Sequence, residues 1–176
     1  YLKAAEQGNA DAQNDLGAKF ETGKGVQQDS AEAVRWYRKA AEHGLAHAQW
    51  NLGVMYSKGS GVQQDYTKAA RWFRKAAKQG LAAAQNDLGA KYVSGNGVQQ
   101  DYTEAVCWFR KAAEQGLAHA QWNLGSVYSK GNGVQQDHTK AVSWFQKAAE
   151  QGDAVAQNDL GGLFFNGLGV KEDHAE

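Results

Sequence analysis

The chain has 176 residues, and its 19 basic and 19 acidic side chains balance to a net charge of zero. This balance creates no field that would attract nucleic acid or an anionic membrane surface, and no apolar run approaches the ~20 residues of a membrane span. The single cysteine, Cys107, excludes an internal disulfide framework. We therefore expect neither a nucleic-acid partner nor membrane insertion.

The sequence repeats with a period of 36 residues, as the leucine series shows: Leu16, Leu52, Leu88, Leu124 and Leu160. A repeat this regular predicts an array of stacked units rather than a globular domain. The predicted units are a tail at 1–3, full repeats at 4–39, 40–75, 76–111 and 112–147, and a partial repeat at 148–176. We expect residues 1–176 to form a single repeat domain that is a fragment of a longer array.

Each repeat predicts two helices, of which repeat 40–75 is the example. In the first helix, Ala48, Leu52 and Tyr56 form one apolar stripe at helical spacing. Gly59 follows as a left-handed C-terminal cap. The same cap is expected at Gly23, Gly95, Gly131 and Gly167. Gly53 interrupts the helix at a cost of about 1 kcal/mol relative to alanine, which indicates that a neighbouring helix packs directly over it.

A tight glycine loop leads into the second helix. Its valine is expected to pack between the helices, in the series Val26, Val62, Val98, Val134 and Val170. Asp65 occupies the N-cap position, as do Asp29, Asp101 and Asp137. Glu32 and Glu104 add the spacing of a capping box.

The second helix carries an apolar face of alanines and aromatic residues. In repeat 40–75 this face comprises Ala69, Trp72, Phe73, Ala76 and Ala77, and the helix is expected to end at Gly80. The tryptophans at this position (Trp36, Trp72, Trp108 and Trp144) recur in every full repeat and are predicted core residues. A two-helix hairpin cannot bury both of its faces alone, so the units must stack.

The framework A-x-x-x-L-G-x-x-Y-x-x-G-x-G-V-x-x-D-x-x-x-A-x-x-W-[FY]-x-K-A-A-x-x-G resembles the Sel1-like repeat family, a relative of the tetratricopeptide repeat. In repeat 40–75 and the start of the next it is met from Ala48 to Gly80. The resemblance implies an all-α fold, a right-handed α/α superhelical solenoid of 36-residue helix-turn-helix repeats. The cysteine pairs of the family's cysteine-rich bacterial branch are missing from this sequence.

One position in the first helix alternates between tryptophan and asparagine. Trp50 and Trp122 lie 72 residues apart, and asparagine stands between and around them at Asn14, Asn86 and Asn158. Repeat 40–75 is identical to repeat 112–147 at 28 of 36 positions but to its neighbour 76–111 at only 23. The copied module is therefore a pair of repeats.

The tryptophans are predicted to point away from the core. Trp50 precedes Leu52 by two residues, which rotates it by about 200° around the helix. In the tetratricopeptide relatives the matching positions line a concave ligand-binding surface. The resemblance therefore implies a partner-binding surface at His47, Trp50, Val54, Lys58, Asn86, His119, Trp122, Lys130, Asn14 and Asn158. The alternative is that each indole ring packs against the adjacent repeat, and the two roles can coexist.

The sequence contains no arrangement of residues typical of catalysis. The histidines His43, His47, His119, His138 and His174 lack the spacing of a helical zinc site. Cys107 is expected to face the surface. The glycine loops follow no predicted strand and lack the lysine of a phosphate-binding loop. We therefore predict no catalytic residue, no metal and no cofactor.

The resemblance implies a non-enzymatic scaffold or adaptor that binds a protein or peptide on its concave face. Similar bacterial proteins are secreted, periplasmic or surface factors in host interaction or signalling, and these compartments are the ones it suggests. Two alternatives remain: an immunity-type inhibitor that neutralises a toxin, and a structural spacer or consensus-type array without a dedicated ligand. A hydrolase of cell-wall or β-lactam substrates is suggested only by distant relatives.

Overall fold

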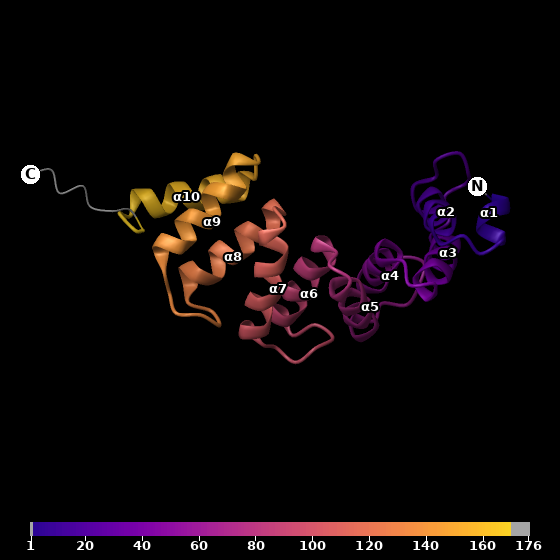
Figure 1. Cartoon of the computed structure of the whole chain (residues 1–176), viewed down its shortest axis with the longest axis horizontal. Coiled ribbons are helices and arrows are strands. Elements are labelled where there is room, and N and C mark those ends of the chain that lie inside the picture. The colour runs from indigo at the N-terminus through magenta and orange to yellow at the C-terminus, as the bar shows by residue number, and fades with distance from the viewer. Residues whose placement is uncertain (1, 170–176) are drawn as a thin grey trace, which may run out of the picture. The chain divides into compact units, whose positions relative to one another are not determined.

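The computed structural model describes residues 2–169, and all regular secondary structure in this range is helical (Figure 1). The helices are α1 (Leu2–Glu6), α2 (Ala10–Thr22), α3 (Ser30–Glu42), α4 (Ala46–Lys58), α5 (Tyr66–Lys78), α6 (Ala82–Ser94), α7 (Tyr102–Glu114), α8 (Ala118–Lys130), α9 (His138–Glu150) and α10 (Ala154–Phe165). The predicted all-α fold of paired helices is confirmed. Tyr1, Val170, His174 and the end of the partial repeat at 148–176 lie outside the described residues.

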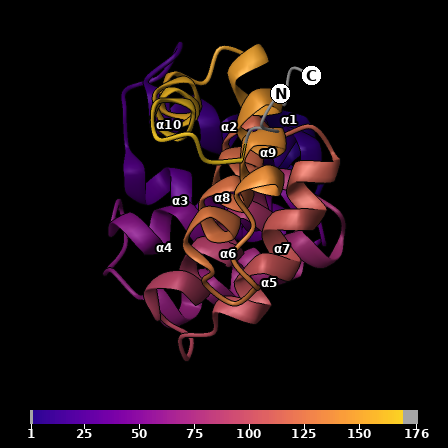
Figure 2. The ribbon, with the colours of Figure 1, turned by 90° about the vertical axis from the view of Figure 1, so that its left-hand side faces the viewer.

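The chain divides into two compact units, Tyr1–Gln99 and Gln100–Glu176. In the first unit, helices α1 to α6 pack in chain order, each against the next one. In the second unit, α7 packs against α8, α8 against α9, and α9 against α10 (Figure 2). Contact between consecutive helices is the pattern that the 36-residue period predicts.

The first helix of each full repeat ends at a left-handed glycine, as predicted. Gly59 has a φ of 72°, and its N–H donates to the Met55 carbonyl at 2.9 Å. Gly23, Gly95 and Gly131 cap their helices with the same backbone conformation. At the last repeat the C-cap is Asn166, one residue before the predicted Gly167, which also has a positive φ.

The second helices begin at the predicted aspartate caps. The Asp65 carboxylate accepts a hydrogen bond from the Lys68 N–H at 2.9 Å, and Asp29, Asp101 and Asp137 occupy the same position. The N–H of Asp65 in turn donates to the Tyr56 carbonyl in α4. The N–H groups of Asp29 and Asp137 donate in the same way to Phe20 and Tyr128, so these three caps each join the two helices of their hairpin.

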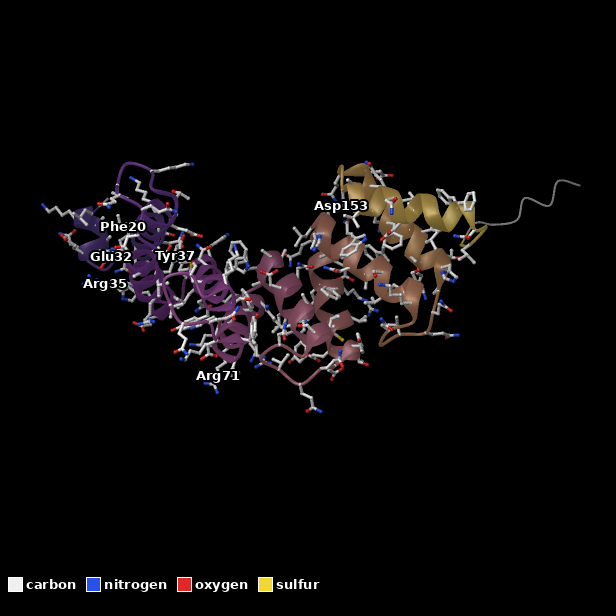
Figure 3. The ribbon with its side chains drawn as sticks, turned by 180° about the vertical axis from the view of Figure 1, so that it is seen from behind. Phe20, Glu32, Arg35, Tyr37, Arg71 and Asp153 are labelled. Atoms are coloured by element: carbon white, nitrogen blue, oxygen red, sulfur yellow. The ribbon has the colours of Figure 1, made fainter. Side chains whose placement is uncertain are left out.

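The predicted capping boxes form only in part. The Asp29 N–H donates to the Phe20 carbonyl at 2.9 Å, so it is not bonded to Glu32. The Glu32 carboxylate instead forms an ion pair with Arg35 at 3.1 Å on the exposed side of α3 (Figure 3). The Glu104 carboxylate accepts a hydrogen bond from the Trp108 indole N–H at 2.9 Å.

The core lies where the helices pack, and Leu52, Leu88 and Leu124 are fully buried in it. Gly53 lies against the Phe73 ring, which confirms the predicted close approach of a helix. Val62 is half-buried.

The tryptophans of the second helices lie at the edge of the core. Trp36 and Trp108 are buried as predicted, but Trp72 and Trp144 are only half-buried. In each repeat a lysine one turn later lies over the indole, at 4.2 Å from the ring centroid for Lys75 and Trp72. A lysine therefore covers one ring face in all four repeats, whether the tryptophan is buried or half-buried.

Candidate partner-binding site

Trp50 is half-buried on α4, and its polar edge is directed at the next repeat. The indole Nε1 donates to the Asp87 carboxylate on α6 at 2.7 Å. Asp87 follows Trp50 by 37 residues, one more than the period. A buried indole N–H needs an acceptor, and a carboxylate makes the bond charge-assisted. The indole therefore joins two consecutive repeats, and the rest of its ring remains partly exposed.

The same junction recurs 72 residues later, in the second unit. The Trp122 indole on α8 donates to the Asp159 carboxylate on α10 at 2.8 Å. The imidazole of His119 lies beside this indole, with ring centroids 5.2 Å apart. His119 and its counterpart His47 are exposed, and so are Lys58 and Lys130. These exposed side chains surround each tryptophan on the first helix.

Two of the asparagines at the alternate position, Asn14 and Asn86, are less exposed than predicted. Asn14 is half-buried and accepts a hydrogen bond from the Asn51 amide at 3.0 Å. Asn86 has only 7% of its surface exposed, so the expectation that it faces an open groove is wrong. An asparagine is short enough to be withdrawn among packed helices where an indole extends beyond them. Asn158 is exposed.

An open pocket lies beside each tryptophan–aspartate pair. In the first unit its volume is about 180 Å³, and it is lined by Val54, Ser57, Lys58, Phe73, Asp87, Ala90 and Lys91. In the second unit its volume is about 300 Å³, and it is lined by Trp122, Ser126, Ser129, Lys130, Phe145, Asn158, Asp159, Gly162, Leu163 and Asn166. All seven positions of the first pocket recur in the second with an offset of 72 residues. The two-repeat module therefore carries one pocket in each copy.

The two pockets differ at the position of Lys91. Its ammonium group donates to the Ser57 hydroxyl at 2.8 Å and lies 5.1 Å from the centroid of the Tyr66 ring. Burial lowers the pKa of Lys91, although the nearby Asp87 carboxylate opposes this shift. The equivalent residue in the second unit is Leu163, which is buried. The first pocket therefore contains an ammonium group of the chain itself, and the second contains an isobutyl group.

Sequence reasoning missed the two aspartates and Lys91. The signal was present, because two adjacent positions alternate together: Trp50–Asn51 and Trp122–Asn123 alternate with Asn86–Asp87 and Asn158–Asp159. Only the tryptophan was singled out. A paired change at adjacent positions indicates contact between consecutive repeats, since each residue at the junction must fit its neighbour.

The described residues hold no group of three or more histidine, cysteine, aspartate or glutamate side chains that could bind a metal ion. Cys107 is exposed, as predicted. Within residues 2–169, none of the helices is long and apolar enough to cross a membrane.

Comparison with known proteins gives consistent matches. The sequence pattern of the Sel1 repeat matches residues 1–9, 10–45, 46–81, 82–117, 118–153 and 154–176. Its units have the predicted 36-residue period but begin at the first helix, six residues later than the predicted ones. No curated protein matches the chain.

Several solved bacterial structures are similar. One is c5321, a protective antigen present in uropathogenic Escherichia coli strains, at 44% identity and a TM-score of 0.93. The match covers 98% of this chain but only 37% of the antigen. A Sel1 repeat protein from Oxalobacter formigenes is 41% identical with a TM-score of 0.88, over 95% of this chain and 69% of that protein. The immunity protein Pa5087 from Pseudomonas aeruginosa is 28% identical with a TM-score of 0.59, over 89% and 58%. With the family pattern matched along its whole length and paired helices repeating every 36 residues, this chain belongs to the Sel1 repeat family.

Proposed function

We propose that this chain is a non-enzymatic scaffold that binds a protein or peptide partner. The partner-binding surface comprises His47, Trp50, Val54 and Lys58 in the first unit and His119, Trp122, Lys130 and Asn158 in the second. Asn14 and Asn86, which the sequence also suggested, are engaged or buried and contribute to packing instead.

One observation carries the proposal: an equivalent pocket recurs beside Asp87 and Asp159, the aspartates that accept the Trp50 and Trp122 indoles. Each pocket combines an aromatic floor, a carboxylate and serine hydroxyls with an exposed lysine at its rim. Sites that bind side chains of a partner combine apolar surface with a few polar groups in this way, and tryptophan is a favoured anchor at such interfaces. A spacer without a ligand has no need of two equivalent pockets.

The test compares partner capture by the wild-type protein with capture by a surface variant. The surface variant combines His47→Ala, Lys58→Glu, His119→Ala and Lys130→Glu, all at exposed positions. The matched control is Arg71→Glu with Lys24→Glu, since Arg71 projects from the second helix α5 and Lys24 is also exposed (Figure 3).

Proteins captured by both the wild type and the control are expected to be lost from the surface variant. Circular dichroism should show the same helical content in all three. Partners that bind the surface variant as strongly as the wild type would contradict the proposed surface. The absence of any specifically captured protein would favour the structural spacer.

A second candidate is an immunity-type inhibitor of a toxin, favoured by the similarity to the immunity protein Pa5087. Co-expression with toxins encoded beside the gene would test it, because an inhibitor restores growth and forms a stable complex. The similarity to a protective antigen of Escherichia coli instead supports a secreted, periplasmic or surface factor in host interaction. Detection of the native protein in fractionated bacterial cells separates these compartments from the cytoplasm.

A further inference from the structure

We propose that the pocket between α8 and α10 binds a lysine side chain of the partner, with its ammonium group between Asp159 and Ser129. This inference rests on the proposed scaffold function and specifies the chemistry of its partner. The first unit offers the precedent, because there the chain's own Lys91 donates to the equivalent serine, Ser57, in the equivalent pocket.

In the first unit the chain's own Lys91 lines the pocket. The Lys91 ammonium donates to the Ser57 hydroxyl at 2.8 Å, and the Asp87 carboxylate, which accepts the Trp50 indole, lines the same pocket. Lys58 at the rim does not exclude this second cation. These groups therefore form a site that accepts an ammonium group on an apolar stem.

In the second unit the same site lacks its cation. Ser129, Asp159 and Lys130 repeat Ser57, Asp87 and Lys58, but Leu163 replaces Lys91. Asp159 still accepts the Trp122 indole through one oxygen. Because a carboxylate has two oxygens with several acceptor sites, it can accept a further donor. This pocket is also the larger of the two, at about 300 Å³.

The apolar parts of the pocket suit the stem of a lysine. Phe145 and Leu163 line the pocket together with the exposed part of Trp122. A lysine buries its methylene groups along such surface while its ammonium group reaches polar partners. Ser126, Asn158 and Asn166 add further oxygen acceptors around the entrance.

The two indole N–H groups provide a direct test, because each donates to the aspartate of its own pocket. The probe is Nα-acetyl-lysine N-methylamide, titrated into ¹⁵N-labelled protein at low salt and followed by the indole resonances. We expect the Trp122 resonance to shift in a saturable way, whereas the Trp50 resonance stays in place because Lys91 already supplies an ammonium group to its pocket. The neutral norleucine analogue controls for apolar binding and should bind at least about ten-fold more weakly.

Reciprocal variants exchange the properties of the two pockets. Leu163→Lys supplies an internal ammonium group to the second pocket and should abolish the Trp122 shift. Lys91→Leu removes the ammonium group from the first pocket, so the Trp50 resonance should shift when the lysine probe is added. Asp159→Asn keeps an acceptor for the indole but removes the charge, and it should weaken probe binding about ten-fold or more.

Two results would overturn the proposal: equal shifts of both indoles in the wild type, or equal binding of the lysine and norleucine probes. If Leu163→Lys unfolds, which thermal melts would reveal, Lys91→Leu and Asp159→Asn still decide the question. The probe titration needs no natural partner. Its failure would therefore leave the scaffold function standing, whereas failure of the capture experiment would leave the pocket chemistry intact.

Discussion

At the scale of single residues, the mid-helix glycines fix how closely the two helices of a hairpin pack. A Cβ added at Gly53 would lie 2.7 Å from the Phe73 ring, and at Gly125 it would lie 2.6 Å from the Phe145 ring. Gly17 has the same relation to Tyr37. Contacts this short cannot exist without movement of the ring, so the gain in helix propensity from alanine is outweighed.

Gly53→Ala should therefore destabilise the protein by up to about 2 kcal/mol, from an overpacking cost of about 1–3 kcal/mol less about 1 kcal/mol of propensity. Gly161→Ala is the matched control, because nothing among the described residues lies within 4 Å of the added Cβ. It should be neutral or stabilising by up to about 1 kcal/mol. Urea denaturation measures both, and a stabilising Gly53→Ala would disprove the packing argument.

Tyr37 carries a hydroxyl at the contact position that Phe73 and Phe145 occupy in their repeats. Tyr37 is fully buried, and its hydroxyl donates to the Glu21 carboxylate at 2.6 Å. Burial, followed by this hydrogen bond and the charge of Glu21, raises the pKa of Tyr37 well above its ordinary value of 10.0. The neutral form is thus favoured in the folded state.

The free energy of unfolding should consequently fall as the pH rises above 10. In that range the unfolded tyrosine loses its proton while the folded one keeps it, so the slope is at most about 1.4 kcal/mol per pH unit for this group. Tyr37→Phe should reduce the slope between pH 9 and 11. Urea titrations at several pH values test this, and an unchanged slope would show that other tyrosines dominate.

At the scale of elements, the helices could be predicted from local signals, and the junctions between repeats could not. Glycine caps, aspartate caps and the apolar stripe of Leu52 are local features, and the structure confirms them. The hydrogen bond from Trp50 to Asp87 spans 37 residues, one more than the period. A period shows which residues are equivalent, but not how far one repeat is displaced against the next. The burial of Asn86 escaped prediction for the same reason.

The charged caps Asp65 and Asp137 stabilise the folded state at neutral pH and lose this effect in acid. The backbone N–H and the side chain of Lys68 lower the pKa of Asp65 below its ordinary value of 3.8. The stabilisation is therefore present above that value and is lost as the pH falls through the lower pKa of the folded state. Asp137 has the same partners in Lys140, and its pKa is lowered in the same way.

Asp65→Asn keeps a cap but removes the charge, so it should lower the thermal midpoint at pH 7 and match the wild type at pH 2. Asp65→Ala should be less stable than Asp65→Asn at pH 7, because it loses the cap as well. Thermal melts at both pH values measure this. A constant difference between wild type and Asp65→Asn would contradict the role of the charge.

At the scale of the whole molecule, the alternation of repeats makes the unit of stability a pair. Where repeat 40–75 meets repeat 76–111, the indole of one bonds the aspartate of the other, and where repeat 4–39 meets repeat 40–75, two asparagines bond. The stability of a repeat array is close to a sum of terms for each repeat and each junction. A repeat inserted singly would place unsuitable side chains at one junction.

The alternating junctions predict different stabilities for two insertion variants. A second copy of 40–111 placed after residue 111 preserves the alternation and should raise the midpoint of urea denaturation. A second copy of 40–75 placed after residue 75 puts Trp50 opposite Asn51 of the copy, so it should raise the midpoint by clearly less than half as much. A gain of one half would mean that the junctions are equivalent.

The loop glycines have a consequence for engineering. Two glycines that precede loop valines lie very close to the preceding repeat: a Cβ at Gly97 would overlap the Tyr66 carbonyl, and a Cβ at Gly133 would overlap Tyr102. A foreign peptide inserted into these two loops would therefore disrupt the packing between consecutive repeats. A Cβ added at Gly80 or Gly116 would meet no atom of residues 2–169 within 4 Å, its chain neighbours aside. These turns are therefore suitable positions for inserting a new binding loop while the packing between repeats is kept.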